Sequence, residues 1–208
     1  MRVIGGEFRS RVLKSLPGLE VRPTPDRLRE ALFSILAPRI SGAIFLDLYA
    51  GTGAVGIEAL SRGAGKALFV EHNEAAVEVI RFNLKSLGLE KRGRVWQGKA
   101  ASVVRKIETS GIAFLDPPYP LEQEYEKALL ALADEPPGLV VAQHAWRFQL
   151  KESYGVLKRG RVVRQGDNAL SFFADEAAQQ DVLLAEKISK KGDPAFTCGR
   201  GSVGPDAG

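Results

Sequence analysis

The stretch Asp47-Leu48-Tyr49-Ala50-Gly51-Thr52-Gly53-Ala54-Val55-Gly56 contains the first residues whose types and spacing could do chemistry. Gly51, Gly53 and Gly56 match the G-x-G-x-x-G pattern of a dinucleotide-binding turn, and Glu71 follows twenty residues after Gly51. Glycine lets the backbone approach a ligand closely, and a carboxylate at Glu71 can accept hydrogen bonds from both hydroxyls of a ribose. The spacing therefore predicts a turn that binds a nucleoside-containing cofactor.

Asp47 indicates which kind of cofactor suits this turn. The pyrophosphate of a dinucleotide would bring negative charge close to the Asp47 carboxylate, which would repel it. S-adenosylmethionine has no phosphate and carries a sulfonium and an ammonium group, which an acid at the end of a strand attracts. Glu71 also has a purely structural interpretation, as an acid near a helix N-terminus that contributes ~0.3–1 kcal/mol. We predict a cofactor site made of Asp47, Tyr49, Gly51, Gly53, Glu71, His72 and Ala100.

A second cluster, Asp116-Pro117-Pro118-Tyr119, directly follows the apolar run 112–115. Its two prolines have no amide hydrogen, so this corner offers acceptors only, namely the Asp116 carboxylate and nearby carbonyl oxygens. Such a site suits an exocyclic amino group, whose two hydrogens are donors, and Tyr119 offers a face on which a base can stack. The alternative is an ordinary proline-rich loop with a buried tyrosine. The predicted catalytic residues are Asp116, Pro117, Pro118 and Tyr119.

Both clusters follow strands in a predicted alternation of strands and helices. The pattern predicts strands at 43–46, 67–70, 94–96, 112–115 and 139–142, and helices at 54–62, from 73 to a stop at Gly88, at 100–108 and at 122–133. Such alternation implies an α/β fold with a doubly wound, mostly parallel sheet covered on both faces. Ligands of these sheets bind beyond the carboxyl ends of the strands, where the strand order reverses. Both clusters are expected there.

The two ends of the chain have a different pattern. Short apolar and basic stretches near the N-terminus predict a small strand-rich arm, and the helix after it is capped by Thr24 and ended by Pro38. Residues 154–164 and 168–174 predict two strands joined as an antiparallel hairpin. The expected organisation is an arm at 1–22, a domain at 23–174, and a mobile extension at 175–208 with a short helix at 181–189.

Composition limits the class of protein. With 208 residues, of which 45% are hydrophobic and 26% charged, the chain has the balance of a globular domain. One cysteine cannot form an internal disulfide, and with only two histidines beside it a zinc site is not expected. No apolar run approaches the ~18 residues of a membrane span, and the N-terminus becomes charged too early for a secretory signal. We expect a cytoplasmic monomer without metal or membrane contact.

The net charge of +4 is concentrated near the N-terminus, where the first thirty residues contain seven basic and four acidic side chains. A second basic stretch runs from Lys158 to Arg164. Such clusters attract a phosphate backbone in a salt-dependent way. From charge alone, a solvated arginine-rich surface is the simpler interpretation.

Together the two motifs resemble class I S-adenosylmethionine-dependent methyltransferases that act on amino nitrogens. The chain most resembles the bacterial family that methylates N2 of a guanine in small-subunit (16S) ribosomal RNA. The resemblance covers about residues 1–174 and includes Arg2-Val3-Ile4-Gly5-Gly6, Arg22-Pro23-Thr24, Arg27-Leu28-Arg29-Glu30-Ala31-Leu32-Phe33 and Gly56-Ile57-Glu58-Ala59-Leu60-Ser61-Arg62-Gly63.

This resemblance implies a seven-stranded sheet whose last strand is antiparallel, S-adenosylmethionine as cofactor, and 16S ribosomal RNA or an assembling small subunit as partner. It also implies that the N-terminal arm holds RNA. The residues expected to bind RNA are Arg2, Arg9, Arg11, Arg22, Thr24, Arg27 and Arg29. In one departure, Gln97-Gly98-Lys99-Ala100 lacks the acid or amide that relatives often place near the cofactor adenine, so backbone or Ala100 packing would replace that contact.

Three other functions are compatible with part of the sequence. A methyltransferase acting on DNA adenine or cytosine would use the same acceptor corner, because that corner recognises an amino group and not a particular base. A nicotinamide-dependent oxidoreductase would explain the three glycines but not Asp47 or the Asp-Pro-Pro-Tyr motif. A non-catalytic RNA-binding assembly factor would keep the basic arm beside a vestigial pocket.

Overall fold

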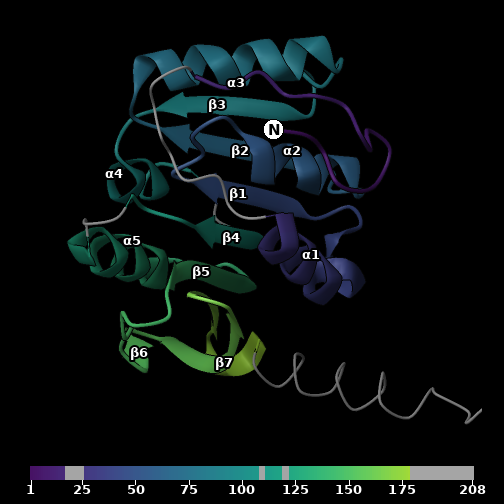
Figure 1. The fold of residues 1–208 in the computed structure, drawn as a ribbon. Helices are drawn as coiled ribbons and strands as arrows, with labels where there is room; N and C mark the ends of the chain where they lie inside the picture. Colours follow the sequence, from purple (N-terminus) through teal and green to yellow (C-terminus); the bar gives the residue numbers. More distant parts are fainter. Residues whose placement is uncertain (17–25, 108–110, 119–121, 179–208) are drawn as a thin grey trace, which may run out of the picture.

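The computed structural model describes residues 1–16, 26–107, 111–118 and 122–178. Within these ranges the strands are β1 Ile44–Leu48, β2 Lys66–Glu71, β3 Gly93–Gln97, β4 Ile112–Leu115, β5 Leu139–Ala145, β6 Ser153–Tyr154, β7 Leu157–Gln165 and β8 Asn168–Ala174. The helices are α1 Asp26–Ile40, α2 Ala54–Ser61, α3 Glu74–Ser86, α4 Ala100–Val104 and α5 Glu122–Asp134. Figure 1 shows the strands as one continuous twisted sheet with the helices packed around it.

The described strands form one sheet in the order β3-β2-β1-β4-β5-β8-β7-β6. From β3 to β5 all neighbouring pairs are parallel, whereas β8 pairs antiparallel with β5 and β7 pairs antiparallel with β8. The chain moves from β1 outward to β3 and then returns to β4 on the other side of β1. This is the reversal of strand order at which α/β sheets bind ligands, and it confirms the predicted doubly wound fold.

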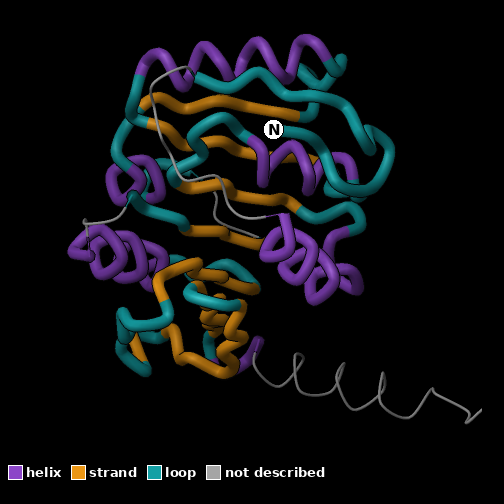
Figure 2. Tube along the Cα trace, viewed as in Figure 1, coloured by secondary structure: helices purple, strands orange, loops and turns teal. Residues whose placement is uncertain are grey.

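The sheet has eight described strands where seven were expected. The predicted strand 154–164 is divided into β6 and β7 at Gly155, whose φ of +55° is left-handed and cannot continue a strand. Both pieces remain antiparallel neighbours, so the extra strand is a short edge of the predicted hairpin. Figure 2 shows these three antiparallel strands at the lower end of the sheet, away from β2 and β3.

Two hydrophobic clusters cover the two faces of the sheet. Along β1, Phe45 lies in the cluster that includes side chains of α1, α2 and α3, whereas Leu46 and Leu48 lie in the cluster that includes α4 and α5. This alternation follows from the period of two along a strand whose faces are both buried. Asp47 has the same parity as Phe45 and therefore faces α2.

Helix α1 continues through Pro38 to Ile40, so the prediction that Pro38 ends this helix is wrong. A proline this close to the end of a helix removes only one of its backbone hydrogen bonds. Ile40 is 4% exposed and packs in the first hydrophobic cluster. Burial of this side chain favours the additional helical residues.

The N-terminal arm is less regular than predicted. Its described part, residues 1–16, contains a single isolated antiparallel bridge between Arg2 and Val12 and no named strand. Val3 and Leu13 are almost fully buried in the same cluster as α1, α2 and α3. This part of the arm is therefore packed on the domain as part of its core, and the expected strands are not found within residues 1–16.

At the other end, residues 176–178 form a short helical turn after β8, and the predicted helix at 181–189 lies outside the described residues. Among the described residues, no helix combines the length and apolar character that crossing a bilayer requires.

Candidate active site

Asp47 is the most buried acid at the carboxyl edge of the sheet, with only 1% exposure. Its Oδ2 accepts a hydrogen bond of 2.8 Å from the backbone N–H of Gly56 in the first turn of α2. The bond is possible because Asp47 lies on the face of β1 that α2 covers. Asp47 thus joins the strand to the helix that follows the glycine turn.

The surroundings of Asp47 raise its pKa from 3.8 to about 7. Burial is the largest cause, and the negative charges of Asp116 and Glu71 add to it, while the Gly56 hydrogen bond lowers the pKa. The structure therefore brings together three carboxylates from β1, the end of β2 and the corner after β4. A cation bound near them would relieve this repulsion.

Glu71 ties the glycine turn to the end of β2. Its Oε2 accepts a 2.8 Å hydrogen bond from the Gly51 N–H, and its Oε1 accepts bonds of 2.8 Å from the N–H groups of His72 and Asn73. Asn73 itself caps α3 by accepting from Ala76. The structural interpretation of Glu71 is thus observed directly. Its two oxygens still have capacity to accept from ribose hydroxyls, because an ionised carboxylate offers about four acceptor positions.

Left-handed backbone shapes the turn between β1 and α2. Gly51 and Gly53 have φ values of +56° and +79°, as expected for glycine, but Tyr49 also has a φ of +72°. For a bulky side chain this conformation is strained and is retained only where surrounding contacts hold it. The Tyr49 hydroxyl is 3.3 Å from both the backbone oxygen and Oε2 of Glu124 on α5. Burial, followed by the negative charge of Glu124, raises the pKa of Tyr49.

Gly56, the third glycine of the motif, packs a helix against a strand. A Cβ at this position would lie 2.3 Å from Cε1 of Phe69 on β2. Only glycine therefore lets α2 lie this close to the sheet, and this closeness is what brings the Gly56 N–H to Asp47.

The acceptor corner lies beside the glycine turn. Strands β1 and β4 are neighbours with Asp47 opposite Phe114 and Leu48 opposite Leu115, so Asp116 follows β4 next to the start of the turn. Asp116 is partly exposed, Pro117 is buried and Pro118 is exposed. Tyr119 lies outside the described residues.

The other predicted cofactor residues differ in accessibility. His72 has 74% of its side chain exposed, with Nδ1 3.5 Å from Glu71 Oε1, so it borders the site at the surface. Ala100 begins α4 and is 2% exposed, which limits it to packing.

The predicted RNA-binding residues fall into three groups. Arg2, Arg9, Arg11 and Arg27 are exposed, whereas Arg22 and Thr24 lie outside the described residues. Arg29 is only 1% exposed, and its Nη2 donates to the Arg2 backbone oxygen and to Asp26 Oδ1. Arg29 is therefore an internal brace between α1 and the arm, and it is removed from the set of phosphate contacts.

Two buried polar residues that sequence reasoning missed hold the arm against the turn and α2. Glu58 is fully buried and accepts hydrogen bonds from the N–H groups of Ile4 and Gly5. Asn83 is 1% exposed; it accepts from the Lys14 N–H and donates to the backbone oxygens of Lys14 and Thr52. The signal for Asn83 was its position three residues after Ile80, on the apolar face of a predicted helix.

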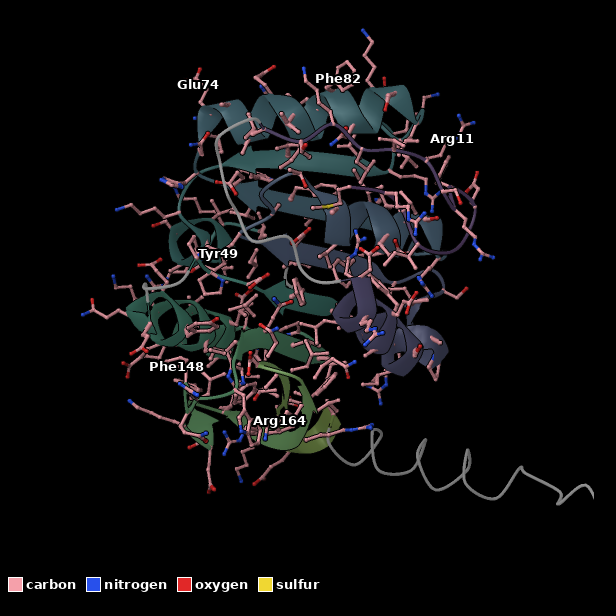
Figure 3. The ribbon with its side chains drawn as sticks, viewed as in Figure 1. Arg11, Tyr49, Glu74, Phe82, Phe148 and Arg164 are labelled. Atoms are coloured by element: carbon pink, nitrogen blue, oxygen red, sulfur yellow. The ribbon has the colours of Figure 1, made fainter. Side chains whose placement is uncertain are left out.

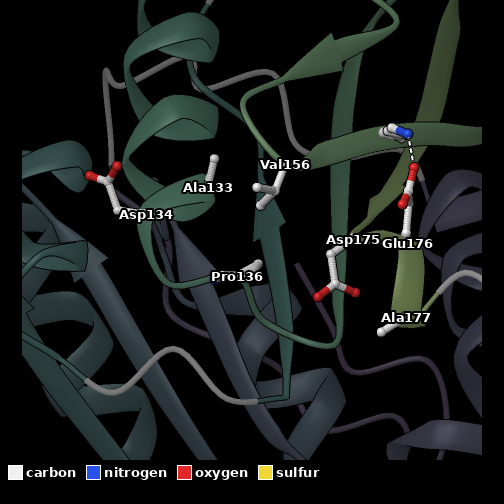
Figure 4. A pocket seen from close by; sticks show the side chains of 8 residues that line it. Ala133, Asp134, Pro136, Val156, Asp175, Glu176 and Ala177 are labelled. Atoms are coloured by element: carbon white, nitrogen blue, oxygen red, sulfur yellow. Dashed lines mark hydrogen bonds and ion pairs between the residues drawn. The ribbon is translucent and has the colours of Figure 1, made fainter.

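A hollow of about 540 Å³ lies away from these residues, between the end of α5, the start of β7 and the turn after β8 (Figure 4). Since α5 starts after β4 and ends before β5, this end of α5 is at the opposite edge of the sheet. Its wall carries Asp134, Asp175 and Glu176, and its one described cation, Lys158, is paired with Glu176. This acidic lining does not suit RNA. Within the described ranges, no three metal-ligating side chains gather into a metal site.

Comparison with known proteins places this site in a family context. Residues 1–174 match the family described as Conserved hypothetical protein 95. The protein YlbH of Bacillus subtilis (strain 168), named as an rRNA methyltransferase, is 38% identical over 183 residues, which cover 83% of this chain and 98% of YlbH. Ribosomal RNA small subunit methyltransferase D of Escherichia coli (strain K12) is 40% identical over 119 residues, covering 57% of this chain and 60% of that protein.

The fold is also found among solved structures of methyltransferases. The Escherichia coli protein yhhF, described as a methyltransferase, superimposes with a TM-score of 0.74 at 31% identity. The superposition covers 85% of this chain and 98% of yhhF. The doubly wound sheet described above is thus that of class I methyltransferases.

Proposed function

Because this chain belongs to the Conserved hypothetical protein 95 family, we propose that it is an S-adenosylmethionine-dependent rRNA methyltransferase whose target is N2 of a guanine in 16S ribosomal RNA. The observation that carries the proposal is the register of β1 and β4, which brings the Asp116 corner next to the glycine turn. A methyl donor and an amino acceptor require two such neighbouring sites.

The carboxylates at the sheet edge fit the charge of S-adenosylmethionine. Asp47 lies among the negative charges of Asp116 and Glu71, which is an unfavourable arrangement unless a cation is added. When bound, S-adenosylmethionine supplies a sulfonium-activated methyl group and the positive charge that this site lacks. Glu71 would hold the ribose, and the left-handed Gly51 and Gly53 would let the backbone lie close to the cofactor.

The corner after β4 fits the acceptor. Pro117 and Pro118 donate no hydrogen bond, so the hydrogens of an exocyclic amino group meet only acceptors there. Holding both hydrogens favours a more pyramidal nitrogen, whose lone pair points out of the ring plane and towards the methyl donor. Asp116 can accept the proton that the nitrogen loses after alkylation. The target guanine has to leave its stack to reach this corner.

Positioning is the main catalytic effect expected from these residues. Bringing oriented reactants together can lower a barrier by ~7–11 kcal/mol. No strong base is needed, because an alkylated amino group loses its proton readily. The exposed arm residues Arg2, Arg9 and Arg11 would contact phosphates and hold the RNA in register.

The proposal is tested by offering labelled S-adenosylmethionine together with unmodified small-subunit particles, free 16S ribosomal RNA, or DNA. Digestion to nucleosides should yield labelled N2-methylguanosine from the ribosomal substrates alone. Label in adenine or cytosine of DNA would contradict the proposed target, and absence of transfer to any nucleic acid would contradict the activity.

A further inference from the structure

The outward face of the arm combines positive charge with apolar surface. Val3 and Leu13 are buried, so their neighbours Arg2, Val12 and Lys14 point outward by the alternation of extended chain. Arg2 and Val12 are also paired across the arm, which puts them on the same side. Val12 is 80% exposed and adds apolar surface to this side of the arm.

Helix α3 adds an aromatic ring to this face. Phe82 is 53% exposed, and the Lys14 Nζ lies 4.7 Å from the centroid of its ring. Figure 3 shows Phe82 on the side of α3 that points away from the sheet, with Arg11 further along the same edge of the molecule. We call Arg2, Val12, Lys14 and Phe82 the arm–α3 face.

This face is held rigidly by the domain. Arg29 of α1 donates to the Arg2 backbone oxygen, Glu58 of α2 binds the N–H groups that follow Val3, and Asn83 of α3 pairs with both backbone groups of Lys14. Three helices thus fix the backbone of the arm. A surface that is ordered before binding loses less conformational entropy when a ligand binds to it.

The face is continuous with the glycine turn. Asn83 donates both to the Lys14 backbone oxygen and to the Thr52 backbone oxygen, and the Thr52 hydroxyl lies 3.7 Å from the Met1 sulfur. A strand of RNA crossing the arm–α3 face is therefore led to the edge where the cofactor and the acceptor corner lie.

We propose that the arm–α3 face binds an unpaired segment of the substrate RNA, with one base stacked on Phe82 and phosphates contacted by Arg2 and Lys14. The inference rests on the proposed function and specifies where its substrate is bound. Cations beside an exposed aromatic ring are the combination that single-stranded nucleic acids require, because bases stack and phosphates need neutralising. The acid nearest in sequence to Phe82, Glu78, is paired with Arg81.

The test compares Phe82→Ala with Leu130→Ala, a matched loss of an exposed apolar side chain on α5. Affinity for an unpaired 16S fragment and for a duplex of the same sequence is measured between low and high salt. Phe82→Ala should weaken binding of the unpaired fragment about tenfold with an unchanged salt slope, and Phe82→Trp should restore it. Lys14→Gln should instead reduce the slope by about one.

Equal affinities of Phe82→Ala and Leu130→Ala would overturn the proposal, as would an equal effect on the unpaired fragment and the duplex. Equal RNA affinities of the two variants are also the result expected if this face binds a protein and not RNA. Binding of S-adenosylmethionine and methyl transfer, measured in parallel, separate this outcome from failure of the proposed function. If the unmodified protein transfers no methyl group, the proposed function is contradicted. If it transfers methyl groups but Phe82→Ala binds RNA with unaltered affinity, only the stacking site is contradicted.

Discussion

The two halves of the candidate site are adjacent and both contain carboxylates, but they differ in the backbone N–H groups around those carboxylates. Around the turn after β1, the buried Asp47 and the partly buried Glu71 accept hydrogen bonds from the backbone N–H groups of Gly56 and Gly51, respectively. In the corner after β4, Pro117 and Pro118 have no backbone N–H to donate. In the proposed function, the first half binds the cationic cofactor, and the second accepts hydrogen bonds from the incoming amino group. Substitutions in the two halves should therefore fail in different assays.

The largest effect is expected from Asp116→Ala, which breaks the acceptor half alone. Methyl transfer should fall by about 10²–10⁴, because the amino group loses both its anchor and its proton acceptor. The dissociation constant of S-adenosylmethionine, measured by calorimetry, should change by less than about threefold, since charge interactions through partly exposed groups are modest. Unchanged turnover would remove Asp116 from catalysis.

Asp47→Asn changes the half around the turn after β1 and should affect cofactor affinity. Burial raises the Asp47 pKa to about 7, so this side chain changes from neutral to ionised as the pH passes through 7. A cationic cofactor binds the ionised form more tightly. Cofactor affinity of the unmodified protein should therefore rise as pH increases through 7. The amide side chain of the variant cannot ionise, so the variant's affinity should be weaker at pH 8 by about tenfold and nearly independent of pH. A calorimetric titration from pH 6 to 8 measures both, and a flat profile in the unmodified protein would contradict the role of Asp47.

The same substitution has an opposite effect on stability. Between the unfolded pKa of 3.8 and the folded pKa of about 7, the folded state holds a proton that the unfolded state has lost. Stability of the unmodified protein is therefore lowered as pH rises through this window. Asp47→Asn keeps an acceptor for Gly56 and removes the buried charge, so its free energy of unfolding at pH 8 should increase by on the order of 1 kcal/mol. Denaturant unfolding at pH 5 and pH 8 tests the sign.

Gly56→Ala should affect stability through the packing of α2 on β2. The added Cβ would overlap the Phe69 ring, and overpacking of this kind costs about 1–3 kcal/mol. Phe69→Leu in the same chain should recover part of this loss, and a double-mutant cycle measures the recovery. Additive losses would show that Gly56 does not act through Phe69.

The smallest effect on the methyl-transfer step itself is expected from charge reversal outside both halves of the site. Arg2→Glu, Arg9→Glu and Arg11→Glu together should weaken RNA binding at low salt and leave cofactor affinity unchanged. The matched control reverses three exposed basic residues outside both basic stretches, namely Lys66, Arg105 and Lys151. Arg105 is paired with Asp134, and Lys151 is paired with Glu126. Equal losses in both variants would mean that net charge alone, and not the arm, binds RNA.

The sequence predicted those parts of the fold that depend on local pattern. The apolar runs of β1, β2, β4 and β5 were located because strands buried on both faces require such runs, and the hairpin of β7 and β8 was located from two strand patterns joined by a short turn. The position of Asp116 beside the turn followed from the order of parallel strands. Pro38 was misjudged because the burial of Ile40, a tertiary effect, outweighs the local signal.

The supports of the site could not be predicted in the same way. Arg29 is basic and lies in a basic segment, so composition suggested a phosphate contact, yet the packing of the arm on α1 buries it. Glu58 and Asn83 are buried because they bind backbone groups more than fifty residues away in the chain. Partners at that separation are fixed only by the assembled fold.

Tyr49 connects the two halves of the candidate site. Its backbone belongs to the glycine turn, and its hydroxyl reaches α5, the helix that begins just beyond the acceptor corner. A movement of the glycine turn would therefore shift the Tyr49 ring relative to α5, and a movement of α5 would shift the same ring relative to the turn. The NMR signal of a fluorine label on this ring should consequently change when either ligand binds. Comparing the change with each ligand alone and with both would tell whether binding of the methyl donor and of the nucleobase is coupled or independent.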